Sequence, residues 1–228
     1  LTAREPGYCP PTLIQAGGKR QLLIWHAESL NGLDPSNGKP YWSVKLEPSF
    51  GMSIAAPRLF GDLLFASGIR NESLVLRLAA DRPAAEEVWR GQTKNSVYCA
   101  NSTPFVSDGY VYGCDCNTGH LRCVRLADGE RQWETLVPTA GGDQRAAHGT
   151  AFIVRHQDRY FLFSETGDLI LCRMTPAGYD EVDRAHLLEP TSSAFGRNVV
   201  WSHPAFAQRC VFARNDKEVI CVSLAANP

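Results

Sequence analysis

The sequence lacks the features that mark several large classes of protein. Its net charge is only −1, from 23 basic and 24 acidic residues, so no global field draws it to nucleic acid or to an anionic membrane. No apolar run approaches the roughly 18 residues of a membrane span. The longest candidates are Leu59–Ala66 and Arg159–Phe163. We therefore expect neither a nucleic-acid partner nor a membrane span.

Local catalytic signatures are missing as well. The chain has no G-x-S-x-G elbow, no H-E-x-x-H helix motif, no glycine-rich phosphate loop and no EF-hand loop. Its eight cysteines lack the C-x-x-C spacing of zinc sites and thioredoxin-like redox motifs. Residue 1 is leucine and no basic-then-apolar leader follows, so we expect any signal peptide or upstream domain to have been removed.

An internal repeat is present instead. Tryptophans end similar segments at Trp42, Trp89 and Trp133, and this spacing is typical of one blade of a β-propeller. A second marker has the same period, because a proline precedes an alternating segment in four of the copies and Thr150 takes its place in the fourth copy. These prolines are Pro11, Pro57, Pro104 and Pro204. Two independent markers therefore predict the same repeat.

The third copy shows the plan of a blade most clearly. Turn sequences rich in Asp, Asn and Gly separate its strand-like runs, and these residues tolerate the positive φ that tight hairpins require. The runs are Ser102–Val106, Tyr110–Cys116, Leu121–Leu126 and Arg131–Leu136. Each copy is therefore expected to form an antiparallel meander of three or four strands.

These repeats predict an all-β fold, a β-propeller of about five four-stranded blades in a single domain, 1–228. One meander cannot bury both faces, so the blades must stack, with Trp42, Trp89 and Trp133 in the seams between them. Proline is tolerated at a sheet edge, which places each proline-led strand innermost. Leu1–Pro6 is a candidate for the strand that completes the last blade and closes the ring. The repeats cover roughly 7–46, 52–91, 98–137, 145–189 and 197–228.

The third copy also resembles a known repeat. GYVYG from Gly109, GHLRCVRL from Gly119 and ADGERQW ending at Trp133 are similar to the pyrroloquinoline-quinone (PQQ) type repeat, G-x-V-Y…G-x-L-x-A-L-D-x-x-T-G-x-x-x-W. LDPSNGKPYW ending at Trp42 is a second match. The family includes quinoprotein dehydrogenases and the scaffold lipoprotein of the outer-membrane β-barrel assembly machinery, usually with seven or eight blades. The resemblance implies an exported, periplasmic protein and a chain that is part of a longer propeller.

The cofactor site of the quinoprotein dehydrogenases has no counterpart in these residues. Those enzymes hold PQQ under a disulfide of two adjacent cysteines, above a calcium ion and a catalytic aspartate. The nearest sequence here is Cys114-Asp115-Cys116, which is one residue too wide, and no segment matches a calcium-ligand set. We therefore expect no cofactor. Asp180, Glu181 and Asp183 are interpreted as a solvated outer strand in preference to a metal site.

The cysteines leave two interpretations open. Cys116 and Cys123 flank one turn, and Cys210 and Cys221 flank another, so either pair is a candidate for a cross-hairpin disulfide. The alternative, which we favour, is that they are small buried apolar residues in the blade faces.

Candidate binding residues cluster before the innermost strands, where the ends of successive blades converge on the channel mouth. The fourth and fifth copies carry His148 and His203 there, and other polar side chains lie beside them or at equivalent points of earlier copies. These are Ser53, Asn101, Ser102, Arg145 and Trp201. The competing interpretation is that the two histidines only satisfy hydrogen bonds between neighbouring inner strands.

Three functions fit this sequence. The leading hypothesis is a non-catalytic propeller that binds a protein or a carbohydrate-like ligand at its channel mouth. The first alternative is a quinoprotein-like dehydrogenase, or a fragment of one, with PQQ and calcium. The second is a purely structural domain of a larger exported protein.

Overall fold

The computed structural model describes every residue except 93, 143 and 226–228, and the regular secondary structure of the described part is β-strand apart from one short 3-10 helix. Blade I contains β1 (Thr12–Ala16), β2 (Lys19–Trp25), β3 (Ser29–Leu33) and β4 (Pro40–Lys45). After the 3-10 helix η1 (Ser49–Gly51), blade II contains β5 (Arg58–Phe60), β6 (Leu63–Gly68), β7 (Glu72–Leu78) and β8 (Ala85–Arg90). Blade III contains β9 (Phe105–Ser107), β10 (Tyr110–Cys114), β11 (Leu121–Arg125) and β12 (Arg131–Thr135).

The C-terminal part continues the same plan with one addition. Blade IV contains β13 (Ala151–His156), β14 (Arg159–Ser164), β15 (Asp168–Thr175) and β16 (Gly178–His186). A separate hairpin, β17 (Ser192–Ala194) and β18 (Arg197–Val199), follows it. Blade V contains β19 (Ala205–Ala207), β20 (Cys210–Arg214) and β21 (Val219–Ser223). All five blades are antiparallel meanders in chain order, which confirms the predicted propeller architecture of about five blades. The β17–β18 hairpin was not predicted.

Turn chemistry explains why the chain folds back at these points. Asp108 and Gly109 join β9 to β10 with φ of 53° and 80°, the two positive values that a type I′ hairpin turn needs. Each complete blade also has a β-bulge between its third and fourth strands. These bulges give the four complete blades a common register.

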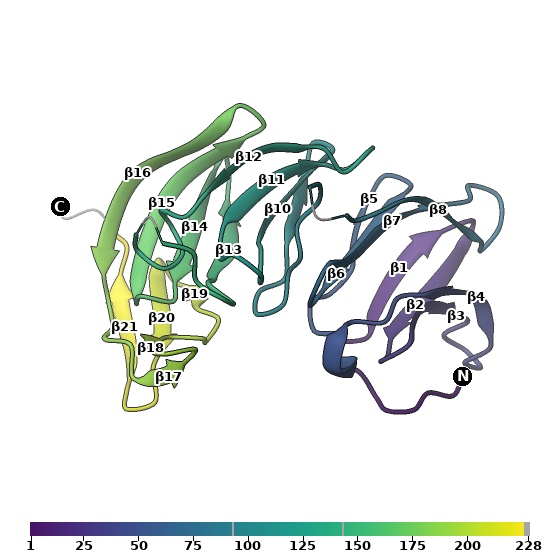
Figure 1. Cartoon of the computed structure of the whole chain (residues 1–228), viewed down its shortest axis with the longest axis horizontal. Helices are drawn as coiled ribbons and strands as arrows, with labels where there is room; N and C mark the ends of the chain where they lie inside the picture. The colour runs from purple at the N-terminus through teal and green to yellow at the C-terminus, as the bar shows by residue number, and fades with distance from the viewer. Residues whose placement is uncertain (93, 143, 226–228) are drawn as a thin grey trace.

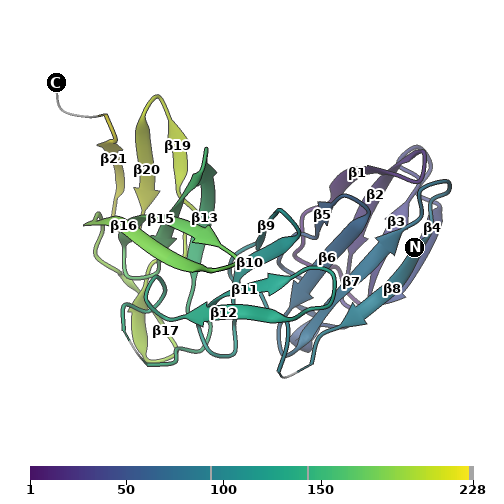
Figure 2. The same ribbon diagram turned by 90° about the horizontal axis from the view of Figure 1, so that it is seen from above.

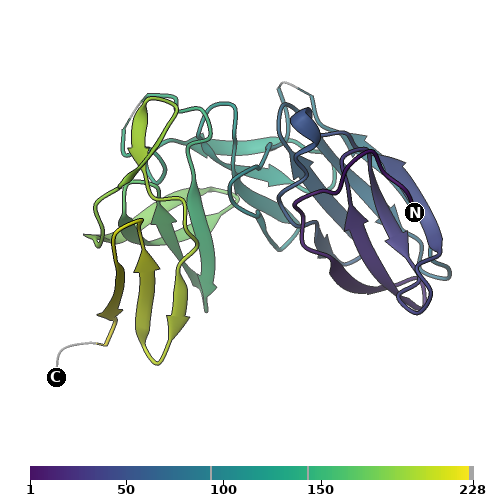
Figure 3. The same cartoon turned by 90° about the horizontal axis from the view of Figure 1, so that it is seen from below.

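The blades follow one another from the N-terminal to the C-terminal side of the molecule (Figure 1). The first strand of each blade is a sheet edge, as the prolines predicted, and β5 lies against β9 of the next blade. Blade I and blade V lie at opposite ends of the molecule, so the blades form an open arc (Figures 2 and 3).

The N-terminal segment does not complete the last blade, which corrects that prediction. Leu1–Pro6 forms no strand, and blade V is a three-stranded sheet. The segment lies along blade I instead, where the Tyr8 amide donates a 2.9 Å hydrogen bond to the Ser53 carbonyl. The ends of the arc are therefore not joined within the described residues.

The predicted tryptophans do lie in the seams. Trp42 belongs to a core cluster made of side chains from blades I and II, Trp89 packs against the cluster of blades II and III, and Trp133 packs against that of blades III and IV. Trp42 is seated on Gly32, where an added Cβ would come within 2.3 Å of the indole Cε2. Glycine is therefore required opposite this tryptophan.

The cysteines are mostly core residues. Cys99, Cys114, Cys116, Cys123 and Cys172 are buried, while Cys221 is exposed. Cys116 and Cys123 lie in different core clusters, so the proposed pairing across their turn is not formed. Burial of the thiol raises the pKa of Cys114 to about 11 and that of Cys123 to about 12.

A buried ion pair anchors the turn after β10. The side chain of Asp115 is fully buried, and Arg122 on β11, only 7% exposed, donates to its carboxylate. The backbone amides of Asn117 and Thr118 donate to the same carboxylate at 3.2 and 3.1 Å. Arg122 also reaches Glu134 at 2.9 Å. The charge of Asp115 is thus compensated, as a buried charge must be.

No helix in the part of the chain that the structure describes is long and apolar enough to cross a membrane.

Candidate binding site around His148

The loops that lead into blades III and IV meet at a histidine and an asparagine. His148 precedes β13, and its Nδ1 lies 3.1 Å from Oδ1 of Asn101, which precedes β9. The Asn101 amide also donates to the His148 carbonyl at 3.5 Å. These hydrogen bonds link the loops that precede neighbouring inner strands, as the competing interpretation of His148 expected. The same contacts hold the imidazole at a fixed orientation beside the surface.

Beside His148, the β17–β18 hairpin presents an exposed aromatic ring. Phe195 at the hairpin turn stacks on the His148 ring, with centroids 4.8 Å apart and planes 13° apart, and lies 6.2 Å from the Trp201 ring. Phe195 nevertheless remains 63% exposed. One face of the Phe195 ring therefore packs on His148, and the rest of the ring is exposed to solvent.

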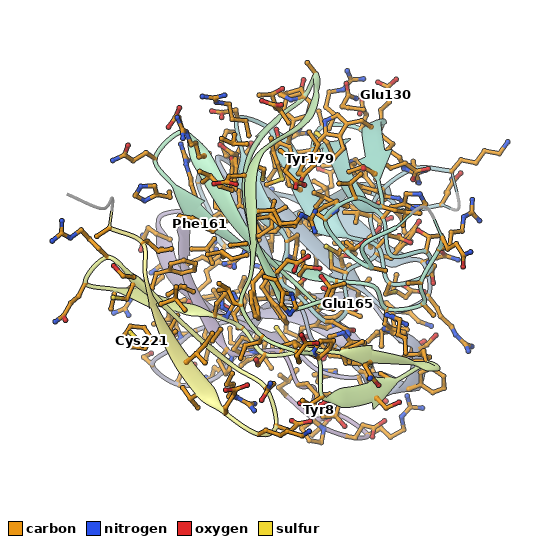
Figure 4. All side chains as sticks on the ribbon, turned by 90° about the vertical axis from the view of Figure 1, so that its left-hand side faces the viewer. Tyr8, Glu130, Phe161, Glu165, Tyr179 and Cys221 are labelled. Carbon is orange, nitrogen blue, oxygen red and sulfur yellow. The ribbon has the colours of Figure 1, made fainter. Side chains whose placement is uncertain are left out.

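A buried glutamate fixes the hairpin in this position. Glu165, at the end of β14, is 1% exposed and accepts hydrogen bonds from three elements. Arg197 on β18 donates to it at 2.7 Å, Trp201 donates its indole N–H at 2.9 Å, and the Thr150 amide donates at 3.2 Å. Figure 4 labels Glu165 near the middle of the molecule. Glu165 thus ties the hairpin and blade IV together.

Two arginines, Arg145 and Arg197, line a cavity of about 490 Å³ with Gln144 and nearby small residues. The guanidinium of Arg197 is paired with the buried Glu165 at 2.7 Å. Burial lowers the pKa of His148 below its usual value, and the positive charge of Arg197 lowers it further. Arg145 forms no salt bridge within the described residues, so its guanidinium supplies positive charge at this cavity. We name Asn101, Arg145, His148, Phe195, Arg197 and Trp201 the His148 cluster.

The structure brings some of the predicted site residues together and separates others. Asn101, Arg145, His148 and Trp201 belong to the His148 cluster, and Ser102 lies beside it, 3.0 Å from the Thr150 hydroxyl. Two predicted residues lie elsewhere. Ser53 is buried in the loop before blade II and donates to the Trp25 carbonyl at 2.9 Å. His203 packs on Phe152, with ring centroids 5.2 Å apart.

Sequence reasoning missed Glu165, Phe195 and Arg197. Phe195 and Gly196 have φ of 51° and 77°, so this dipeptide is a hairpin turn whose glycine was the available signal. Glu165 gave no signal, because its three partners are far from it in the sequence.

The residues that the structure describes do not fit a PQQ–calcium site. Among the described residues, no three His, Cys, Asp or Glu side chains converge as metal ligands would. Cys114 and Cys116 belong to different core clusters, so they do not form the platform that adjacent cysteines provide. Of the acidic residues on β16, Glu181 is held by Arg184 at 2.8 Å and by the Tyr179 hydroxyl at 2.7 Å. Its carboxylate is thus engaged with protein partners.

Comparisons with known proteins agree with this architecture. The family model described as "Outer membrane protein assembly factor BamB" matches residues 26–227. No curated protein sequence matches the chain. Among solved structures, BamB from Moraxella catarrhalis aligns with a TM-score of 0.59 and 12% identity, over 96% of this chain and 59% of that one.

Two further solved structures share the fold. Quinohemoprotein alcohol dehydrogenase from Comamonas testosteroni aligns with a TM-score of 0.58 and 12% identity, over 92% of this chain and 39% of that one. The Cps50 (Swd1) β-propeller domain of Myceliophteria thermophila aligns with a TM-score of 0.54 and 10% identity, over 88% and 64%. The chain thus spans less than two thirds of each of these structures.

Proposed function

The chain belongs to the family of the outer membrane protein assembly factor BamB, and we propose that it is a non-catalytic propeller that binds a protein partner at the His148 cluster. The family supports a scaffold role, and its named member is a factor for the assembly of outer membrane proteins. By the same family argument, we propose that the protein is exported to the periplasm.

The observation that carries the proposal is the exposure of Phe195. A phenylalanine that is 63% exposed and stacked on His148 leaves an ordered apolar surface in water. Aromatic and arginine side chains are the residues that dominate protein–protein interfaces, and Arg197, on the same hairpin as Phe195, lines a cavity with Arg145. The partner segment is therefore proposed to be apolar with a carboxylate, which matches the Phe195 ring and the charge of Arg145.

A quinoprotein-like dehydrogenase is the second candidate, and a fold-level likeness to the alcohol dehydrogenase supports it. Calorimetric titration of the purified chain with PQQ and Ca²⁺ tests this candidate. We expect no saturable heat, because the described residues do not provide the ligands. Saturable binding would favour the dehydrogenase.

Site-specific photo-crosslinking tests the proposed binding site. A photoreactive phenylalanine analogue at position 195 is expected to give a discrete adduct with one protein in the periplasm of expressing cells. The same analogue at Tyr8, which is 69% exposed on another part of the arc, is the control. Loss of the adduct when Arg145 is changed to Glu would tie it to the His148 cluster, whereas equal adducts at both positions would contradict the proposal.

A further inference from the structure

Two seams of the propeller contain a tryptophan packed on a second aromatic ring in a similar geometry. Between blades II and III, the Trp89 ring lies 6.2 Å from the Phe65 ring at an interplanar angle of 44°. Between blades III and IV, the Trp133 ring lies 6.1 Å from the Tyr112 ring at 41°. In both cases a tryptophan of the fourth strand covers an aromatic ring of the second strand.

The strand register shows where blade IV should carry its tryptophan. In blade III, Tyr112 pairs with Cys123, which pairs with Trp133. In blade IV, Phe161 pairs with Leu171, which pairs with Asp183, and the bulge lies at the same point. Blade IV therefore keeps the aromatic ring of the second strand but has an aspartate where the tryptophan belongs.

A cavity is present where that indole would lie. Its volume is about 270 Å³, and apolar side chains from blades IV and V make up most of its wall. The lining residues are Phe161, Leu169, Leu171, Asp183, Arg184, Ala185 and Leu224. Phe161 and Leu224 also line a second cavity of about 460 Å³ on blade V. Figure 4 shows Phe161 on the side of the molecule that faces the viewer, above Cys221 of β21.

The residue that accepts the hydrogen bond of Trp89 has an equivalent in blade V. The Trp89 indole donates at 2.8 Å to the carbonyl of Leu126, whose own amide donates to the Gly109 carbonyl at the preceding turn. Leu224 holds the same place in blade V, since its amide donates to the Arg209 carbonyl at the corresponding turn. Leu224 also lines the cavity, so the counterpart of the residue that accepts from Trp89 lies beside it.

An acidic side chain lies at the edge of this cavity. The Asp183 carboxylate accepts a 2.8 Å hydrogen bond from the Arg184 amide and forms no salt bridge within the described residues. The guanidinium of Arg184, which also lines the cavity, is paired with Glu181 and Asp168. A free carboxylate at this edge favours a ligand that carries positive charge beside its aromatic ring.

From these relations we infer that the seam between blades IV and V is a docking pocket for a tryptophan side chain of a partner protein, flanked in the partner by lysine or arginine. The partner's indole takes the place that Trp89 and Trp133 occupy in the sibling seams. Such an anchor in an apolar pocket is the usual centre of an interface. This pocket shares no residue with the His148 cluster, so the inference does not depend on the function proposed above.

Nuclear magnetic resonance titration with short peptides tests the pocket directly in the unaltered chain. The probe is acetyl-Lys-Trp-Lys-amide, and acetyl-Lys-Ala-Lys-amide is its matched control. We expect the tryptophan peptide to shift the backbone amides of Leu171, Ala185 and Leu224 saturably at millimolar concentrations, and the alanine peptide to leave them unchanged. No saturable shift with the tryptophan peptide, or equal shifts with both, would overturn the inference.

Filling the pocket from within provides a second test. Asp183→Trp restores the residue of the sibling seams, so it should raise the peptide dissociation constant at least tenfold and raise the melting temperature by about 2–4 °C. Asp180→Trp adds an indole to the same strand outside the lining and should change neither quantity. Undiminished peptide binding by a folded Asp183→Trp variant would overturn the inference, and the titration of the unaltered chain decides the matter if that variant does not fold.

Discussion

The indole N–H of Trp89 on β8 donates a 2.8 Å hydrogen bond to the carbonyl of Leu126, which belongs to the next blade. Trp133 does the same across the following seam, donating at 2.7 Å to the Thr175 carbonyl. Trp42 differs, because its indole donates to Gln21 of its own blade at 2.7 Å. The outer strands of blades II and III are thus tied to the next blade by one polar contact in addition to apolar packing.

Removing the Trp89 ring should therefore destabilise the propeller. We expect Trp89→Ala to lower the free energy of unfolding by about 3 kcal/mol, because it removes a packed aromatic ring from a seam. Trp89→Phe should cost about 1 kcal/mol, close to the worth of the lost hydrogen bond. Urea unfolding followed by circular dichroism measures both. A change within about 0.5 kcal/mol for the alanine variant would show that the seam does not depend on this residue.

Arg122 should be essential for stability because of the charge it compensates. Arg122→Met leaves the buried Asp115 carboxylate without its cation and should cost about 3–5 kcal/mol. Arg125→Met is the matched control on the same strand, since Arg125 is 40% exposed and its ion pairs are at the surface. Chemical denaturation compares the two variants. Equal, small losses would show that Asp115 does not need its buried partner.

Stability should depend on pH through His186. Its Nδ1 lies 2.8 Å from Asp168, and this hydrogen bond raises the pKa of His186 above its ordinary 6.5. A raised pKa in the folded state means that the protonated histidine stabilises the fold below pH 6.5, and that this contribution is lost as the pH rises through the folded pKa.

His186→Gln should accordingly lower the melting temperature more at about pH 5.5 than at about pH 8.5. Thermal unfolding of both proteins at the two pH values gives the comparison. A difference that is constant with pH, or larger at the higher value, would mean that the imidazolium–Asp168 pair does not contribute.

Thiol labelling should separate the cysteines by their positions. Cys221 on β21 is exposed, whereas Cys99, Cys114 and Cys123 are buried in the seams. Native protein treated with iodoacetamide should therefore be alkylated at Cys221, with the buried thiols reacting only after unfolding. Peptide mass mapping measures the extent at each site. Protection of Cys221 in the native protein would show that the outer face of blade V is covered.

The fold could be predicted well from the sequence because the strands and turns of each blade are specified by residues close together in the chain. Tight turns such as Asp108-Gly109, alternating strands and the periodic tryptophans all depend on residues close together in one copy. The completion of blade V by Leu1–Pro6 was wrong, since no local signal specifies which distant segment pairs with an edge strand.

The candidate site was predicted less completely. His148, Asn101 and Trp201 were found because each lies just before an innermost strand. Glu165 and Phe195 were missed, because their contacts with Arg197 and His148 arise only when blade IV and the β17–β18 hairpin come together. The cavity between blades IV and V could not be predicted from the sequence for the same reason, since the strand register is needed to align Asp183 with Trp133.

The central claim is that Phe195 binds a protein partner without supporting the fold. Its most direct test is the dissociation constant of the partner recovered by crosslinking at position 195, measured for the unaltered chain and for Phe195→Ala together with their melting temperatures. We predict at least a tenfold rise in the dissociation constant, which is about 1.4 kcal/mol, with no change in melting temperature. An unchanged dissociation constant, or a lowered melting temperature that accounts for the loss of binding, would contradict the claim.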